Sequence, residues 1–290
     1  MNVIRLDEGG QFHPFALSWS HRIAGDATSM DKSQHKYGPD HWQFGHLRFP
    51  EGNRAVPILV LIHGGFWRSQ HGLELMEPMA SEFTQMGYAT FNIEYRRVGQ
   101  HGGGWPGTLH DMISAVSYLT TLASTYPLDL TRVTLIGHSA GGQMALWLAG
   151  RHLLPQNHFL NGVQTIPLAR VVSLAGVVDL LSMWQCEHGR DPVEQFLGGP
   201  PMTCPNRYRE TSPINLLPTD TFTVLVHGTE DSRVPLTQSQ DYWLKARTLN
   251  SPVILKTLPG MDHFQLIDPH SSAWPTVVAA VREPYPLYDS

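Results

Sequence analysis

From Pro57 onward, the hydrophobic positions of the chain fall into two alternating kinds of segment. The first kind is a short, continuous apolar run rich in branched residues, which is typical of a strand buried on both faces of a parallel sheet. We expect such strands at Ile58–Ile62, Ala89–Ile93, Val133–Ile136, Val171–Leu174, Phe222–Val226 and Val253–Leu258.

The second kind of segment has the spacing of a helix. Apolar residues recur at intervals of three and four positions over residues 76–86 and 109–119, and this period indicates one buried helix face. Thr108 and Asp111 have the spacing of a capping box at the start of the second helix. Strands that alternate with helices predict an α/β fold with a doubly wound, mostly parallel sheet flanked by helices. Because ligands of such sheets bind at the carboxyl ends of the strands, we expect the chemistry in the loops that follow them.

Composition narrows the class of protein. Of the 290 residues, 41% are hydrophobic and 16% are charged, and the formal net charge is −5. These values indicate a globular protein and argue against a disordered tail or a coiled coil. The sequence shows no basic patch, so we expect no nucleic-acid partner. Residues 1–290 are expected to form one domain, with the polar, irregular residues 1–44 as an N-terminal arm packed on it.

Three features bear on localisation. Cys186 and Cys204 are the two cysteines, too few for a disulfide framework, which favours a reducing compartment. The first residues show neither the apolar region nor the cleavage site of a signal peptide. The longest apolar run, Ile58–Ile62, is far shorter than the ~20 residues of a membrane span. We therefore expect a cytoplasmic protein with no membrane partner.

The sharpest chemical signal is the sequence Gly-His-Ser-Ala-Gly at residues 137–141. It follows an expected strand and opens a segment of helical pattern, which is the setting that a G-x-S-x-G nucleophile elbow requires. Glycine at both ends leaves no side chain to collide across the tight turn. Ser139 is therefore expected to project at a helix N-terminus, where backbone N–H groups favour negative charge. It is the candidate nucleophile.

A serine hydroxyl is a weak nucleophile and needs a base that is oriented by an acid. In chains with such an elbow, the acid and then the histidine follow the serine in the sequence. Asp231 lies in a glycine-containing loop after an expected strand, and we choose it as the acid, with its neighbour Glu230 as the alternative. His263 is the only one of the sixteen histidines that combines the right order with such a loop after a strand. It is the candidate base.

The sequence His-Gly-Gly-Phe-Trp at residues 63–67 directly follows the first expected strand. Acyl transfer develops negative charge on the carbonyl oxygen, and rigid backbone N–H donors stabilise that charge. Glycine lets the backbone approach a substrate closely, so we expect an oxyanion hole formed by the N–H groups of Gly65, Phe66 and Ala140. His63 is expected to shape this loop by hydrogen bonding and not to act as a second base.

Together the sequences HGGFW, GHSAGG, HGTEDSRVP and MDHF resemble the α/β-hydrolase-fold serine esterases. The tryptophan of HGGFW is similar to that of the kynurenine formamidase (arylformamidase) group and its carboxylesterase relatives, and the resemblance covers residues 37–282. It implies an α/β-hydrolase fold, a Ser-His-Asp triad, a small-molecule ester or amide as substrate, and no metal or organic cofactor. The histidines at positions 35, 41 and 46 also lack metal-ligand spacing. The oligomeric state is left open.

In the resembled fold, the interval at about residues 176–220 supplies a cap over the active site, and here that interval is short. Aromatic residues near the expected loops are candidates to line an acyl or aryl pocket, with core packing as the alternative for each. They include Phe66 and Trp184, and the predicted substrate-binding set is Trp67, Trp105, Phe196 and Phe264. Arg96 and Arg97 are expected to pair with buried acids such as Glu94.

Three functional hypotheses follow. The first is a serine hydrolase of carboxylic esters or of aryl formamides such as N-formylkynurenine. The second keeps the triad but cleaves peptide bonds, because the same constellation serves peptidases. The third is a non-catalytic binding protein on a hydrolase scaffold. The second hypothesis ranks below the first, since no large extra domain is present to control the entry of peptides. The third ranks below the first, since the triad and the oxyanion glycines are all present.

Overall fold

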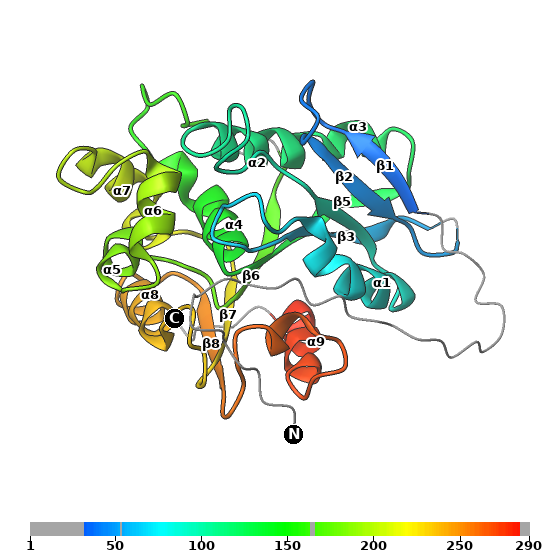
Figure 1. Cartoon of the computed structure of the whole chain (residues 1–290). Coiled ribbons are helices and arrows are strands. Elements are labelled where there is room, and N and C mark those ends of the chain that lie inside the picture. The colour runs from blue at the N-terminus through cyan, green and yellow to red at the C-terminus, as the bar shows by residue number, and fades with distance from the viewer. Residues whose placement is uncertain (1–31, 53, 163–165, 285–290) are drawn as a thin grey trace, which may run out of the picture.

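The computed structural model describes residues 32–52, 54–162 and 166–284. These residues form one twisted sheet and the helices that cover it (Figure 1). Most of the expected N-terminal arm, residues 1–31, lies outside the described residues. The strands are β1 (Lys32–Lys36), β2 (Phe44–Arg48), β3 (Val56–Ile62), β4 (Ala89–Ile93), β5 (Leu128–His138), β6 (Leu168–Leu174), β7 (Thr223–Gly228) and β8 (Val253–Leu258).

The strands lie in the order β1-β2-β4-β3-β5-β6-β7-β8. Neighbours from β4 to β8 pair in parallel, whereas β1 and β2 add antiparallel at one edge. The six strands expected from apolar runs coincide with β3 to β8, which confirms the mostly parallel sheet. Strand β1 belongs to the segment expected as an arm. The sequence does not reveal it as a strand, because its residues alternate between exposed and half-buried at the sheet edge and form no apolar run.

Successive residues of β3 supply both hydrophobic cores of the protein. Ile58, Val60 and Ile62 face one core, and Leu59 and Leu61 face the other. This alternation is the pleat of a strand that is covered on both faces. The central strands therefore read as continuous apolar runs, which is why the sequence reveals them.

Helices cover the two faces unequally (Figure 1). Helices α1 and α9 pack over the core that contains Leu59, and α2, α4 and α8 pack over the core that contains Ile58. The helices are α1 (Glu77–Gln85), α2 (Gly107–Ser117), α3 (Leu119–Ala123), α4 (Ala140–Gly150), α5 (Leu180–Gln185), α6 (Arg190–Leu197), α7 (Pro205–Thr211), α8 (Leu236–Thr248) and α9 (Trp274–Arg282). Short 3-10 turns are η1 (Leu73–Met76), η2 (Arg151–Leu153), η3 (Pro213–Leu216) and η4 (Gln265–Ile267).

The capping box expected for α2 is wrong. The helix begins at Gly107, and its N-terminal flanking residue makes no side-chain cap. The Thr108 hydroxyl instead donates to the carbonyl oxygen of Arg96, and the Asp111 carboxylate binds the Arg96 side chain and Gln43. Tertiary partners therefore take both side chains away from the helix terminus. The Arg96–Asp111 pair is one of the arginine–acid pairs that the sequence predicts.

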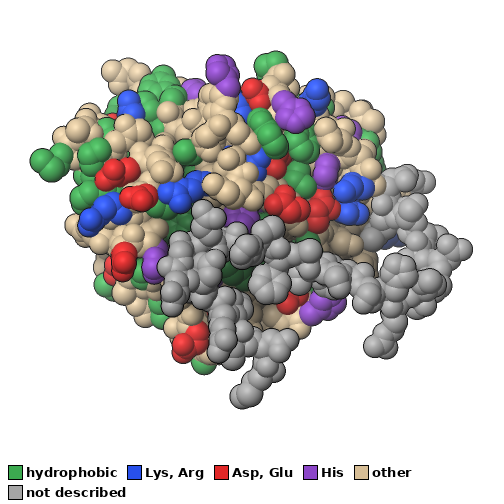
Figure 2. Space-filling model, in the orientation of Figure 1, with side chains coloured by type: hydrophobic (Ala, Val, Ile, Leu, Met, Phe, Trp, Pro, Cys, Tyr) green, Lys and Arg blue, Asp and Glu red, His purple; other side chains and the backbone are tan. Residues whose placement is uncertain are grey.

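Between β6 and β7 the chain forms α5, α6, α7 and η3, which together fill the interval expected as a short cap. In the part of the chain that is described, no helix is long and apolar enough to cross a membrane. On the face seen in Figure 2, acidic and basic side chains are interspersed around apolar ones.

The double-sided core predicts a large penalty for truncating a central strand residue. Phe91 on β4 has no exposed surface and faces the ring of Tyr118. Phe91→Ala should lower the free energy of unfolding by about 3–5 kcal/mol, because it leaves a cavity. Phe159→Ala removes the same atoms from a residue that is 55% exposed, and should cost less than about 1 kcal/mol. Urea denaturation measures both, and equal costs would contradict this packing.

Candidate active site

Ser139 occupies a sharp turn between β5 and α4. Its backbone has φ 56° and ψ −118°, a conformation that residues with side chains rarely adopt. A Cβ on Gly137 would lie 2.1 Å from the carbonyl oxygen of Gly141, and one on Gly141 would lie 2.0 Å from that of Ile62. Only glycine fits at these two positions, so strand, turn and helix follow one another as the sequence pattern predicts.

The turn is held from several sides. All eleven residues of α4 are buried, which gives the turn a rigid base. The Ser139 N–H donates to the carbonyl oxygen of Leu174 at the end of β6, at 2.9 Å. The Val177 N–H donates to the carbonyl oxygen of Ser139 at 3.3 Å. The position of the serine is therefore set by two strands and one helix together.

Asp231 is bound at both carboxylate oxygens in the loop after β7. Its Oδ1 accepts the N–H groups of Arg233 and Val234 at 2.8 and 2.9 Å. Its Oδ2 accepts from Nδ1 of His263 at 2.6 Å. Glu230, the alternative acid, is exposed. The structure therefore brings Asp231, and not Glu230, to the imidazole of His263.

A second histidine shares the Asp231 carboxylate. Nε2 of His227 lies 3.3 Å from Asp231 Oδ2 and 3.0 Å from the carbonyl oxygen of Val234. Because both neighbours are acceptors, this nitrogen carries a proton, and Nδ1 faces the hydroxyl of Ser239 at 2.7 Å. Burial raises the pKa of Asp231, but the hydrogen bonds from His227 and His263 outweigh it and hold that pKa well below its usual range. Asp231 is therefore ionised at neutral pH.

His138 precedes the serine and packs against His263. The two ring centroids lie 4.4 Å apart, and Nε2 of His138 donates to the carbonyl oxygen of His263 at 3.0 Å. This contact attaches the loop of His263 to the turn of Ser139. Burial, together with the charge of His263, lowers the pKa of His138 well below its usual value. His138 is therefore neutral, and its Nδ1 has no hydrogen-bond partner among the described residues.

The loop after β3 approaches the nucleophile closely. A Cβ on Gly64 would lie 2.9 Å from the Cβ of Ser139. Gly65 and Phe66 follow with φ of 108° and 51°, so the chain turns through left-handed conformations beside the serine. Within the described ranges, the N–H groups of Gly65, Phe66 and Ala140 donate to no hydrogen-bond acceptor. These N–H groups are the donors expected from the sequence.

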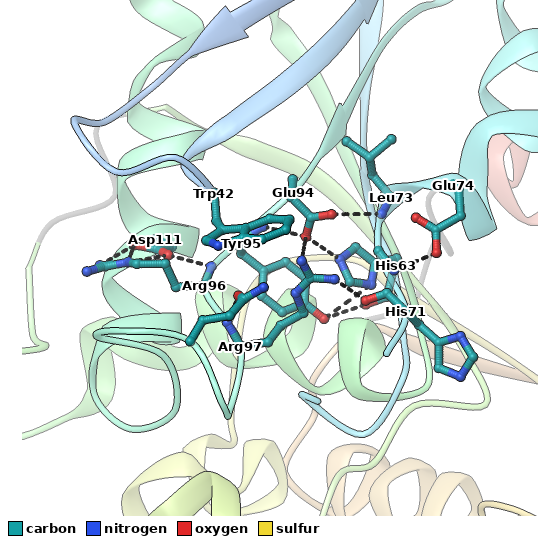
Figure 3. Close-up of polar contacts among 12 residues, drawn as sticks. Trp42, His63, His71, Leu73, Glu74, Glu94, Tyr95, Arg96, Arg97 and Asp111 are labelled. Carbon is teal, nitrogen blue, oxygen red and sulfur yellow. Dashed lines mark hydrogen bonds and ion pairs between the residues drawn. The ribbon is translucent and has the colours of Figure 1, made fainter. Parts of the chain in front are cut away.

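A buried ionic cluster supports this loop (Figure 3). Nε2 of His63 lies 3.0 Å from Oε1 of Glu94, and the His63 ring stacks on Tyr95 with 4.3 Å between centroids. Arg97 pairs with the same carboxylate at 3.2 Å, and the Tyr95 hydroxyl donates to the carbonyl oxygen of His63 at 3.0 Å. Burial raises the pKa of Glu94, but contacts with His63 and Arg97 lower it overall. His63 thus has structural partners on its ring and its backbone.

The expected pocket aromatics fall into two groups. Trp67 and Phe196 have no exposed surface and stack on each other, with 4.5 Å between centroids and 6° between planes. Since neither offers surface to a ligand, both have a packing role in this structure. Phe264 is 48% exposed, with its ring edge-on to His263, and Trp105 is half-buried. A substrate contact remains a prediction for these two.

Sequence patterns do not single out three buried polar residues near the site, namely Gln143, His227 and Ser239. His227 is the last residue but one of β7 and lies four positions before Asp231, and this place at the start of the HGTEDSRVP sequence is the signal that could have found it. Gln143 and Ser239 lie inside helices and belong to no motif. Among the described residues, no group of three or more histidine, cysteine or acidic side chains could hold a metal ion.

A family model described as BD-FAE matches residues 47–245, which is more than half of the chain. The chain belongs to the BD-FAE family. The matched segment contains Ser139 and Asp231 and ends before His263. The BD-FAE match therefore covers the turn of Ser139, the loop after β3 and the loop of Asp231, but it does not reach His263.

Curated relatives of this BD-FAE member include enzymes of two kinds. It is 28% identical over 217 residues to the acylamino-acid-releasing enzyme of Mus musculus, covering 72% of this chain and 28% of that enzyme. It is 26% identical over 218 residues to the probable carboxylic ester hydrolase LipM of Mycobacterium tuberculosis, covering 72% of this chain and 49% of LipM. The chain thus spans less than half of the length of either relative.

Solved structures show the fold. A truncated carbohydrate esterase from gut microbiota superposes with a TM-score of 0.75 at 18% identity, covering 90% of this chain and 99% of that one. Esterase B from Lactobacillus rhamnosis gives a TM-score of 0.72 at 18% identity, with 87% and 86% covered. The BD-FAE member therefore has the α/β-hydrolase fold, as predicted.

The buried, neutral His138 predicts a stability that is sensitive to acid. An unfolded histidine takes up a proton below about pH 6.5, whereas the lowered pKa of His138 prevents uptake in the folded protein. Stability present above about pH 6.5 is therefore lost as the pH falls, by up to about 1.4 kcal/mol per pH unit. His138→Gln, whose amide can still donate to His263, should lose less stability between about pH 7 and 5.

Urea denaturation at a series of pH values measures this difference. His101→Gln replaces an exposed histidine and should keep the wild-type dependence on pH. If His138→Gln also kept the wild-type dependence, His138 would not be a buried group that resists protonation.

Proposed function

We propose that this chain is a serine hydrolase that cleaves carboxylic esters through an acyl-enzyme. In this proposal Ser139 is the nucleophile, His263 the general base and Asp231 the acid that orients it. The observation that carries it is the 2.6 Å hydrogen bond between His263 and the buried carboxylate of Asp231. The loop of His263 is in turn joined to the turn of Ser139 by the hydrogen bond from His138 to the carbonyl oxygen of His263.

Acylation begins when the Ser139 hydroxyl oxygen attacks the carbonyl carbon and its proton passes to Nε2 of His263. Nδ1 of His263 keeps its own proton because Oδ2 of Asp231 accepts from it, so Nε2 is the basic atom. The imidazolium that forms is stabilised by Asp231, whose lowered pKa keeps it ionised. The acid orients and stabilises the base and does not itself take the proton.

His263 next donates the proton from Nε2 to the oxygen of the leaving alcohol, which departs and leaves the acyl group on Ser139. Water then attacks the acyl carbon while Nε2 takes a proton from it, and the carboxylic acid leaves as Ser139 regains its hydrogen. In both halves the N–H groups of Gly65, Phe66 and Ala140 donate to the carbonyl oxygen while it carries negative charge.

For the substrate we propose esters with a small or aromatic group, with aryl formamides such as N-formylkynurenine as a second class. The ester assignment is supported by the names of LipM and of the structural neighbours. The exposed ring of Phe264 beside His263 offers apolar surface to such a group. The formamide class rests on the resemblance of the HGGFW sequence alone.

A peptidase with the same triad is the second candidate function. The similarity to the acylamino-acid-releasing enzyme over 72% of this chain favours it. The match leaves most of that longer enzyme uncovered, so the similarity does not extend to the rest of that enzyme. We therefore rank ester cleavage first.

The nucleophile assignment predicts that Ser139→Ala reduces turnover of an aryl acetate to the uncatalysed background, because no acyl-enzyme can form. A fluorophosphonate probe should label the wild type on Ser139, as read by mass spectrometry, and should leave the variant unlabelled. Ser124→Ala, which changes an exposed serine on another helix end, should behave as wild type. Activity that survives in Ser139→Ala would exclude this mechanism.

The same assay separates the substrate classes. The kcat/KM of the wild type is compared on a short-chain aryl ester, N-formylkynurenine and an aminoacyl anilide. Higher values on the ester or the formamide support the proposal, and a dominant anilidase activity would favour the peptidase. A folded, probe-reactive protein that turns over none of the three would favour a binding function.

The acid assignment predicts that Asp231→Asn lowers kcat by about 10⁴-fold, because an amide no longer selects the required tautomer of His263. Glu230→Gln is the matched control one position earlier. Its side chain is exposed, and its kcat should stay within about threefold of wild type. Steady-state kinetics at saturating ester measure both, and a large loss in Glu230→Gln instead would reassign the acid.

A further inference from the structure

Trp67 joins three parts of the molecule at one buried position. It closes the HGGFW loop, and it has no exposed surface. Its indole Nε1 donates to Oε1 of Gln143 on α4 at 3.0 Å. Its ring stacks on Phe196 of α6 at 4.5 Å. The loop after β3, the helix behind Ser139 and the segment between β6 and β7 therefore meet at a single side chain.

The loop needs an anchor because its backbone is strained. Phe66 and Trp67 have consecutive positive φ values of 51° and 57°. Residues with a Cβ keep such conformations only where surrounding contacts over-determine them. The backbone supplies two such contacts, from the Arg68 N–H to the Gly65 carbonyl oxygen at 3.0 Å and from the Val98 N–H to the Trp67 carbonyl oxygen at 2.8 Å. The Trp67 side chain supplies the connection to α4.

Gln143 is fixed at both ends of its amide. Its side chain is fully buried, and Nε2 donates to the carbonyl oxygen of Thr211 at 2.9 Å. An indole N–H can only donate and a carbonyl can only accept, so the amide has one orientation that satisfies both partners. Its backbone N–H also donates to the carbonyl oxygen of Ser139 at 3.2 Å. Gln143 thus links the turn of Ser139, through its backbone, to Trp67, through its side chain.

We propose that Trp67 and Gln143 are positioning residues that set the gap between the two halves of the oxyanion hole. One half, the N–H groups of Gly65 and Phe66, belongs to the strained loop. The other half, the N–H of Ala140, belongs to α4. The indole–amide hydrogen bond ties the loop directly to the helix. The inference rests on the proposed function, because donors must be held close to the developing oxyanion only if acyl transfer occurs.

The test variant is Trp67→Phe, which removes the indole N–H and keeps an aromatic ring against Phe196. Its kcat on an aryl ester should fall by about tenfold or more while KM stays within about threefold, because the misplaced donors act on the transition state. The affinity for a trifluoromethyl ketone, which forms an oxyanion with the serine, should fall in parallel with kcat.

Trp147→Phe is the matched control. Trp147 lies on the same helix, is fully buried, and donates from Nε1 to the carbonyl oxygen of Glu210 at 3.0 Å. The variant loses an equivalent hydrogen bond that involves neither Trp67 nor Gln143. It should lower the thermal midpoint of unfolding while its kcat stays within about threefold of wild type.

A double variant separates positioning from folding. Trp67→Phe leaves the Gln143 amide oxygen buried without a donor, and adding Gln143→Met removes that oxygen but also the donor of the Thr211 carbonyl oxygen. Stability therefore changes further in the double variant, whereas kcat should stay at the level of Trp67→Phe, because the indole–amide hydrogen bond is already lost. Recovery of kcat in the double variant would overturn the proposal, and so would a wild-type kcat in Trp67→Phe.

Failure of the proposed function is read separately, from the wild type, as no turnover of any ester and no probe label on Ser139. In that event hydrogen exchange over residues 63–68 decides whether the indole fixes the loop. Faster exchange in Trp67→Phe than in Trp147→Phe supports the anchoring role, and equal exchange in the two variants overturns it.

Discussion

The whole site depends on the close approach of three loops at the carboxyl ends of β3, β5 and β6. A Cβ on Gly141 would meet the carbonyl oxygen of Ile62 at 2.0 Å, and one on Gly142 would meet the Cα of Gly176 at 2.6 Å. Main chain therefore packs directly on main chain. Because the expected oxyanion donors are backbone N–H groups, this contact fixes them with little freedom, and little reorganisation is needed when charge develops.

Two buried carboxylates stabilise the two sides of this arrangement. Glu94 joins the ring of His63 to Arg97 beside the loop after β3, and Asp231 joins the rings of His227 and His263 on the other side. A buried charge is costly unless it is paired and hydrogen-bonded. Each carboxylate here has at least two partners, so the cost is offset and the imidazoles are held in defined orientations.

Strands buried on both faces were predictable, because β3 to β8 are continuous apolar runs, and the motif loops could be placed at their ends. Edge strand β1 was not, since three of its five residues are exposed. Local patterns also cannot tell whether an aromatic lines a pocket or packs. Trp67 stands beside the expected donors, yet it is buried by Phe196, which lies far away in sequence. Thr108 likewise has the spacing of a helix cap, but its hydroxyl donates to the carbonyl oxygen of Arg96, a contact that the local pattern does not indicate.

The uncharged His138 affects the electrostatics of product departure. Since it stays unprotonated against the ring of His263, Asp231 is compensated only while His263 holds the extra proton. Once that proton is lost, the negative charge of Asp231 is again unbalanced. A carboxylic acid released beside it ionises in water, and the resulting anion would meet this negative charge. In the proposed reaction, the neutral His138 therefore adds no positive charge that would hold the product anion beside His263.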